Sequence, residues 1–277
     1  MLSMLKLLAT TVLLNSVLLA NENVKIEQFL AEKFQENPAI VSLNVKVLDR
    51  VKINSVAGWD AVIVTVDAVV EAKPKNQEVH QKMIWFTNGE VITQELTNIN
   101  TGESLKDSVN PEFKNEYYTK HNLIYGKSTA KYKVAIFSDP LCPFCSTFVP
   151  EAIEEMKKYP DKFAVYYYHF PLPRLHPAAV PIAKAAIAAE LEGIKNVTLR
   201  MYNMKIDPHE KDLRTILEVF NRKMGTDIKE ADLSSKEVLQ HYQNDLRIAE
   251  ELMVSGTPTM FFDNKLDRTK RLYQKAP

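Results

Sequence analysis

The sequence contains very little cysteine: only two of its 277 residues, Cys142 and Cys145. A structural zinc site usually needs four ligands, commonly two cysteine pairs, and no second pair exists here. The sequence also has no excess of charge of either sign, with 35 basic and 35 acidic residues. Proteins that bind nucleic acids normally carry a basic patch, so this balance argues against that class. We therefore expect no metal site and no nucleic-acid partner.

The two cysteines stand three residues apart, in the run Cys142-Pro143-Phe144-Cys145. A disulfide stabilises a fold more when it closes a longer loop, so a structural bridge here would contribute little. The C-x-x-C spacing is instead typical of thiol–disulfide exchange, in which the first thiolate attacks a disulfide and the second resolves the mixed disulfide. Zinc binding and an inert bridge are the alternatives. We expect both cysteines to be catalytic, with no cofactor beyond their own redox-active disulfide.

The residues around the pair support this interpretation. Residues 134–138 form a short apolar run of strand type, which Asp139 and Pro140 end. Residues 146–159 carry apolar side chains at helical spacing. Cys142 is therefore expected where a strand ends and a helix begins, exposed and with its thiolate stabilised by the helix N-terminus. Cys145, one turn further, is expected to be the shielded resolving thiol.

A second informative motif lies far downstream, at residues 255–259, Ser-Gly-Thr-Pro-Thr. It precedes a strand-like run at 260–262, and in a chain with a redox pair this position favours a cis Thr257–Pro258 bond. An ordinary trans turn is the alternative. Closer to the cysteines, Asp139 could tune the pKa of Cys142 or only cap the following helix.

Together, the strand, the CPFC run, the helix and the late Thr-Pro resemble the thioredoxin superfamily, over residues 131 to about 262. The resemblance implies an α/β thioredoxin-like fold. It also implies an active-site loop, formed by Pro143, Phe144, Thr257 and Pro258, that binds substrate beside the disulfide. One departure is clear: relatives carry a buried acid six residues before the first cysteine, and Ile136 occupies that position here. The proton acceptor for Cys145 therefore stays open.

Two shorter runs resemble particular branches of the bacterial Dsb proteins. Residues 138–145 look most like DsbG, whereas residues 169–172 with the following His176-Pro177 look more like DsbA. Residues 177–252 read as consecutive helices, an insertion of the DsbA type in which His209 and His241 are expected to be solvated. We thus expect a catalytic domain at residues 127–277.

The beginning of the chain resembles an export signal. Residues 1–20 carry one lysine, a mostly apolar run and a small final residue, Ala20. This pattern predicts a cleaved signal peptide and a periplasmic protein; an uncleaved membrane anchor is the alternative.

Residues 21–109 read as a small α+β domain. A helix is expected near residues 24–34, with Ile26, Phe29, Leu30 and Phe34 near one face. Strands are expected at 42–48, 61–70, 81–87 and 91–96, with a two-residue hairpin turn at Asn88-Gly89. The order resembles the cystatin-like domain of DsbC and DsbG, which implies a homodimer; a monomeric accessory domain is the alternative. Residues 110–126 are expected to form a helical linker, because Asn110-Pro111 is a typical helix start and Gly126 a typical stop.

The expected substrates are unfolded or misoxidised exported proteins, with a membrane redox partner of the DsbB or DsbD type. An oxidase that donates its disulfide, and an isomerase or reductase that is kept reduced, are nearly balanced as interpretations. A dimeric holdase chaperone without redox activity is the third alternative, which would leave the CxxC pair without a role.

Overall fold

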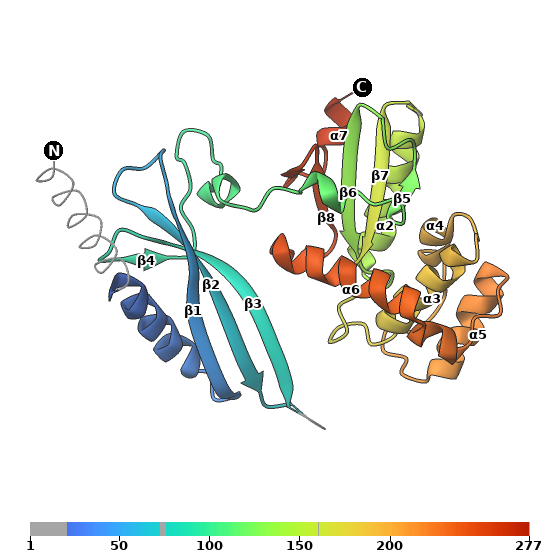
Figure 1. Ribbon diagram of the computed structural model, residues 1–277, viewed down its shortest axis with the longest axis horizontal. Helices are drawn as coiled ribbons and strands as arrows, with labels where there is room; N and C mark the ends of the chain where they lie inside the picture. Colours follow the sequence, from blue (N-terminus) through green and yellow to red (C-terminus); the bar gives the residue numbers. More distant parts are fainter. Residues whose placement is uncertain (1–20, 73–75, 160, 277) are drawn as a thin grey trace, which may run out of the picture. The chain divides into compact units, whose positions relative to one another are not determined.

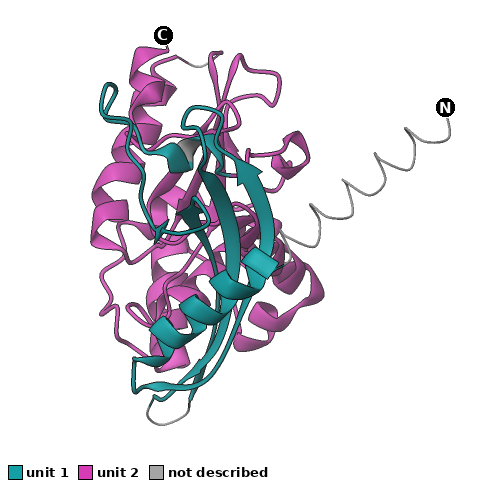
Figure 2. Ribbon diagram, turned by 90° about the vertical axis from the view of Figure 1, so that its left-hand side faces the viewer, with its two compact units in different colours: residues 1–110 teal, residues 111–277 magenta. Residues whose placement is uncertain are grey.

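The computed structural model describes residues 21–72, 76–159 and 161–276. The expected signal peptide, residues 1–20, lies outside this part of the chain. The chain divides into two compact units after Asn110 (Figure 2). The sequence predicts the end of the first domain one residue earlier, after residue 109. Within the described residues, no helix combines the length and the apolar character needed to span a membrane.

The N-terminal unit is a helix packed against one face of an antiparallel sheet (Figure 1). The helix covers residues 21–35, and the strands follow in chain order as β1 (Ile40–Lys52), β2 (Asp60–Val70), β3 (Gln77–Thr87) and the short β4 (Ile92–Thr93). Ile26 and Leu30 of the helix pack on Val62 and Val64 of β2. A 3-10 turn, η1 (Leu105–Ser108), lies near the end of the unit.

Two local predictions for this unit are wrong. The fourth strand, β4, has only two residues, whereas the sequence predicts a strand over residues 91–96. The turn between β3 and β4 has four residues, not two, because Thr87 pairs with Ile92. The Asn88 side chain holds this longer turn by accepting hydrogen bonds from the Glu90 and Val91 amides, at 3.1 and 2.8 Å.

The C-terminal unit has a five-stranded mixed sheet in the order β5-β7-β6-β8-β9. Parallel strands β6 (Tyr132–Ser138) and β7 (Phe163–His169) are joined through helix α2 (Pro143–Lys157). Strand β8 (Thr259–Phe262) runs antiparallel to β6, and β9 (Lys265–Leu266) and β5 (Leu123–Tyr125) form the two edges. The short helix α7 (Leu272–Lys275) closes the chain.

Four helical segments lie between β7 and β8, as the sequence predicts for an insertion. They are α3 (Ala179–Leu191), α4 (Val197–Met201), α5 (Leu213–Met224) and α6 (Lys236–Glu251), with a 3-10 turn η3 (Glu230–Ser234) before α6. Side-chain caps begin two of them: Asp212 accepts from the Thr215 amide at the start of α5, and Ser235 accepts from the Val238 amide at the start of α6. Such caps satisfy amides that have no partner inside the helix.

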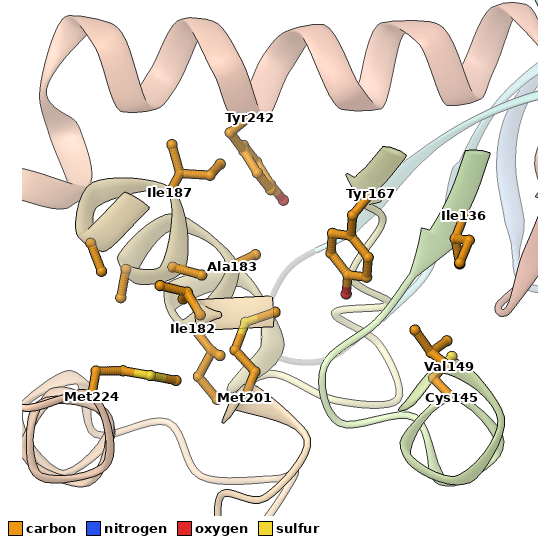
Figure 3. Close-up of a cluster of buried hydrophobic side chains, with 14 of the residues drawn as sticks. Ile136, Cys145, Val149, Tyr167, Ile182, Ala183, Ile187, Met201, Met224 and Tyr242 are labelled. Carbon is orange, nitrogen blue, oxygen red and sulfur yellow. The ribbon is translucent and has the colours of Figure 1, made fainter. Parts of the chain in front are cut away.

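Both faces of the central sheet are covered, so successive residues of a strand enter different cores. On β6, Val134 and Ile136 join a cluster with α2 and α3, which Figure 3 shows in part. Ala135 and Phe137 join the opposite cluster, together with Ile248 of α6. The CPFC segment is thus anchored by a strand with no solvent-facing side.

The predicted helical linker at residues 110–126 is wrong. This stretch contains only a 3-10 turn, η2 (Asn115–Tyr117), and then strand β5. The Phe113 amide donates to the Asn264 carbonyl (2.7 Å), and the Phe113 ring is fully buried, so contacts with the C-terminal unit override the local helix signals. Gly126 ends β5 rather than a helix: with φ +80°, it passes so close to Phe163 that a Cβ would lie 1.9 Å from the Phe163 carbonyl oxygen.

Candidate active site

The CPFC segment lies where β6 ends and α2 begins, as predicted. Cys142 is the N-cap residue of α2, and Pro143 follows in the first turn. Proline suits this position because its missing N–H would have no partner inside the helix. Cys142 is 5% exposed and Cys145 is fully buried, and both are free thiols. Cys145 is the more shielded thiol, as expected, but Cys142 is less open than the sequence indicated.

No side chain caps helix α2, so the amides of its first turn remain available near Cys142. The unpaired N–H groups and aligned peptide dipoles at such an end stabilise negative charge. The Thr257 carbonyl lies 3.7 Å from Cys142 Sγ, although it is 115 residues away in the chain. The Thr257–Pro258 bond is cis, which confirms that prediction. The fold therefore brings the predicted loop and the predicted thiol together.

Cys145 lies in a different environment. Burial raises the pKa of its thiol to about 11, and the nearby Ser138 and Thr257 side chains and the Asp139 main chain act in the opposite direction. Ile136, which stands where relatives carry a buried acid, belongs to the same apolar cluster as Cys145 (Figure 3). Burial thus disfavours the ionisation of Cys145, and only uncharged groups nearby favour it.

Behind Cys145, three hydroxyl groups form a continuous chain that sequence reasoning did not find. Ser138 Oγ lies 2.6 Å from the hydroxyl oxygen of Tyr202, which lies 2.9 Å from that of Tyr167. Ser138 ends β6, Tyr167 belongs to β7, and Tyr202 caps the C-terminal end of α4. No local motif marks Tyr202, because it reaches Ser138 from 64 residues away.

Asp139 does not cap α2, since Cys142 holds the N-cap position. Its carboxylate is fully buried and accepts hydrogen bonds from the amides of Leu141 and Leu172, both at 2.7 Å, and lies 2.9 Å from His176 Nδ1. The side chain therefore joins the loop before Cys142 to the loop after β7. The Asp139 main chain, and not its carboxylate, lowers the pKa of the Cys145 thiol.

A second buried polar cluster lies at the end of β7. Asp245 of α6 accepts hydrogen bonds from the His169 amide (2.9 Å) and from the Asn122 side chain (2.8 Å). Burial raises the pKa of Asp245 to about 8 and lowers the pKa of His169 to about 3. His241 belongs to this cluster and is not solvated as expected: its side chain is 11% exposed, and burial lowers its pKa to about 4. His209, by contrast, is exposed as predicted.

Several apolar side chains of the C-terminal unit are exposed. Phe144 is 77% exposed and Leu175 is 59% exposed, and Pro143 is also exposed. Single exposed apolar side chains are common, but Pro143 and Phe144 directly follow the outer thiol in the chain. Among the residues that the structure describes, no three His, Cys, Asp or Glu side chains are grouped as a metal ion would require.

Residues 118–273 match a family model described as thioredoxin. The chain belongs to the thioredoxin family. The match covers the sheet, α2, the helical insertion and the cis-proline loop of the C-terminal unit, and it confirms the fold that the CPFC motif predicts.

Among curated proteins, this thioredoxin-family chain is similar to the Na(+)/H(+) antiporter NhaA 1 of Mycolicibacterium gilvum, with 31% identity over 153 residues. It is also similar to the NhaA 1 of Mycolicibacterium vanbaalenii, with 29% identity over 145 residues. These matches cover 52% and 50% of this chain but only 24% and 22% of the antiporters. The chain thus spans less than a quarter of the length of these relatives.

Two solved structures are similar to the chain. A thioredoxin-like oxidoreductase from Silicibacter pomeroyi DSS-3 has a TM-score of 0.47 and 22% identity, over 54% of this chain and 84% of its own. The thiol-disulfide exchange protein alpha-DsbA2 from Wolbachia pipientis has a TM-score of 0.47 and 18% identity, over 58% of this chain and 88% of its own.

Proposed function

We propose that this protein exchanges thiols and disulfides with other proteins through Cys142 and Cys145. The observation that carries the proposal is the pairing of two unlike thiols one helical turn apart. Cys142 stands at the N-terminus of α2 beside the Thr257 carbonyl, and Cys145 is buried behind it. A structural bridge would need neither the helix terminus nor the adjacent loop.

The chemistry proceeds in two balanced steps. The Cys142 thiolate attacks one sulfur of a substrate disulfide, which forms a mixed disulfide and releases one substrate thiolate. Cys145 then attacks Cys142 Sγ, which forms the Cys142–Cys145 disulfide and releases the second substrate thiolate. The substrate gains the two electrons that the dithiol loses, and the reverse sequence oxidises a substrate dithiol. The pair needs no further cofactor.

The substrates we propose are unfolded or misoxidised exported proteins. The main chain of Thr257 lies beside Cys142 and is placed to contact an extended polypeptide, and Phe144 offers an exposed apolar ring next to the thiol. We further propose that residues 1–20 direct the protein to the periplasm, and that a membrane protein of the DsbB or DsbD type resets its redox state.

The exchange itself is tested by equilibrating the protein with defined ratios of reduced and oxidised glutathione and then alkylating the remaining thiols. We expect a single transition between a dithiol and an internal Cys142–Cys145 disulfide. If both thiols remain alkylated at every ratio, the proposal is wrong. The holdase alternative makes a different prediction, because its protection of unfolded chains would persist in Cys142→Ser.

The direction of the reaction follows from the redox state in cells. An oxidase is held mostly as the disulfide, whereas an isomerase or reductase is held mostly as the dithiol. Acid quenching of cells followed by alkylation of Cys142 and Cys145 separates these two forms.

We also propose that the N-terminal unit forms a homodimer. Strand β1 is an edge of its sheet and carries the exposed side chains Val41 (59%) and Leu48 (55%). An unpaired edge is prone to pair with another strand, and a second copy provides a symmetric partner.

Light scattering of the intact mature chain at micromolar concentration should give a dimer mass. Leu48→Lys should shift this mass towards the monomer. Ile99→Lys, at an exposed position outside the strands, should not. A monomer mass for the unmodified chain would remove the dimer.

A further inference from the structure

The proposed exchange requires Cys145 to lose a proton in a place where a charge is poorly solvated. Its side chain is fully buried, and desolvation disfavours a thiolate. Ile136 supplies no acid or base. The Asp139 carboxylate is held by Leu141, Leu172 and His176. Another feature must therefore stabilise the charge that develops on Cys145.

The three-hydroxyl chain of Ser138, Tyr202 and Tyr167 has the right position and chemistry. Tyr167 belongs to the same buried cluster as Cys145, the Ser138 side chain lowers the pKa of the Cys145 thiol, and the Ser138 oxygen lies 2.6 Å from the Tyr202 hydroxyl. Tyr167, 2% exposed, extends the chain at 2.9 Å. Each hydroxyl can donate one hydrogen bond while it accepts another, so the three can align in one direction.

We propose that this hydroxyl chain stabilises the Cys145 thiolate during resolution of the mixed disulfide. Tyr167 donates to Tyr202, Tyr202 donates to Ser138, and Ser138 donates to Cys145 Sγ. Hydrogen bonds in such a row polarise and strengthen one another. Ser138 contacts the reacting sulfur, and the two tyrosines are positioning residues that act through it. The inference rests on the proposed exchange function.

The step is balanced without any further reactant. Cys145 Sγ attacks Cys142 Sγ, the Cys145–Cys142 bond forms, and the bond from Cys142 to the substrate sulfur breaks. The Cys145 proton ends on the released substrate thiolate. The chain therefore needs to stabilise charge, and it does not need to accept a proton permanently.

The other titratable group that acts on the Cys145 thiol is Cys142, and Asp139, whose main chain also acts on this thiol, is paired with His176. The two positioning tyrosines come from different elements: Tyr167 from the central sheet and Tyr202 from the helical insertion. The helical insertion thereby contributes a positioning residue, Tyr202, to the proposed chain.

The test follows the two steps separately with one equivalent of the aromatic disulfide 5,5′-dithiobis(2-nitrobenzoate). The attack of Cys142 releases the first coloured thiolate, and resolution by Cys145 releases the second. We expect Ser138→Ala to slow the second phase about tenfold, as for loss of a hydrogen bond to a charged group. Tyr202→Phe should slow it about threefold and Tyr167→Phe about twofold, with the first phase unchanged. Ser138→Ala should reach the wild-type second-phase rate only about one pH unit higher.

The matched control is Tyr168→Phe. Tyr168 is the next residue on β7, is fully buried, and donates a hydroxyl hydrogen bond to the Tyr117 carbonyl (2.7 Å) on the other face of the sheet. The Tyr168→Phe variant should lose stability without slowing the second phase.

If Tyr202→Phe slows both phases equally, or if neither Ser138→Ala nor Tyr202→Phe slows the second phase, the hydroxyl chain has no such role although the exchange stands. If the wild-type protein shows no second phase at all, both the exchange and this inference fail.

Discussion

The two units of this chain differ most in the polar groups that they bury. Among the described residues, the N-terminal unit buries only the neutral polar side chains Thr65 and Thr87. The C-terminal unit buries Asp139, His169, Asp245 and Asp267 as well as both thiols. Burying an ionisable group costs free energy unless it is hydrogen-bonded or neutralised. Asp267 serves a turn, where it accepts from the Lys270 and Leu272 amides, but the others lie near the thiols or at the end of β7.

Exposed apolar side chains show the opposite distribution. Most of the large ones belong to the N-terminal unit, and they include Phe29, Val41, Leu48 and Ile99. In the C-terminal unit the most exposed is Phe144, between the two cysteines. The buried ionisable groups therefore gather in the unit that holds the thiol pair, and most of the large exposed apolar side chains lie in the other unit.

The substitution with the largest expected effect abolishes disulfide exchange and leaves both units folded. Cys142→Ser should reduce the rate of disulfide exchange by roughly a thousandfold or more, because the attacking sulfur is removed. The thermal midpoint should change little. Reduction of a small aromatic disulfide, measured beside a melting curve, checks both parts. Exchange at the wild-type rate in this variant would mean that another group performs the attack.

A pair of glycine substitutions tests the units independently. Gly126→Ala should destabilise the C-terminal unit by about 3 kcal/mol or more, because a Cβ would meet the Phe163 carbonyl at 1.9 Å and φ is +80°. Gly58→Ala has a similar φ, +79°, but open space around it, and should cost the N-terminal unit only about 1 kcal/mol.

Urea unfolding can separate these two effects, because both tryptophans, Trp59 and Trp85, lie in the N-terminal unit. The urea midpoint followed by tryptophan fluorescence should fall for Gly58→Ala and stay unchanged for Gly126→Ala. The midpoint followed by tyrosine circular dichroism should fall for Gly126→Ala. A single shared transition in both variants would show that the units unfold together.

The buried acid Asp245 predicts a pH dependence confined to the C-terminal unit. Its folded pKa of about 8 lies above the ordinary value of 3.8, so its contribution is complete below about pH 4 and is lost as the pH rises through 8. Asp245→Asn removes this dependence. The free energy of unfolding of the variant should therefore be lowest relative to the wild type at pH 4 and below, and this difference should shrink by about 4 kcal/mol between pH 5 and pH 9. Parallel stability curves for the two proteins would contradict the assignment.

The smallest expected effect concerns the exposed ring between the cysteines. Phe144→Ala should leave the free energy of unfolding within about 0.5 kcal/mol of the wild type, because the side chain is 77% exposed. It should slow the reaction with an unfolded protein substrate about threefold, and the reaction with a small disulfide less. Equal slowing with both substrates would mean that Phe144 acts on the thiol and not on the polypeptide.

The sequence predicts those features that are determined by residues close to one another in the chain. The strand, the break at Asp139 and the amphipathic helix place Cys142 within a single local pattern, and Asp212 and Ser235 mark the starts of α5 and α6. The linker prediction is wrong because residues 111–125 are held by distant partners, such as the Asn264 carbonyl for the Phe113 amide. Local propensity carries no information about such contacts.

The same reason explains what is missing from the predicted site. Thr257 was found only because a recognisable Pro motif follows it, whereas Tyr167 and Tyr202 have no motif and meet Ser138 only after β7 and α4 have packed. The position of Asp139 beside the cysteine pair predicts a role for it, but only its contacts with Leu141, Leu172 and His176 show that it joins two loops.

The most direct test of the central claim is to trap the covalent intermediate. Cys145→Ala leaves Cys142 able to attack but removes the resolving thiol, so a mixed disulfide with a protein substrate should accumulate and should map to Cys142 by peptide mass analysis. Cys142→Ala should trap nothing, because the remaining thiol is fully buried. A mixed disulfide that maps to Cys145, or none in Cys145→Ala, would contradict the assignment of Cys142 as the attacking thiol.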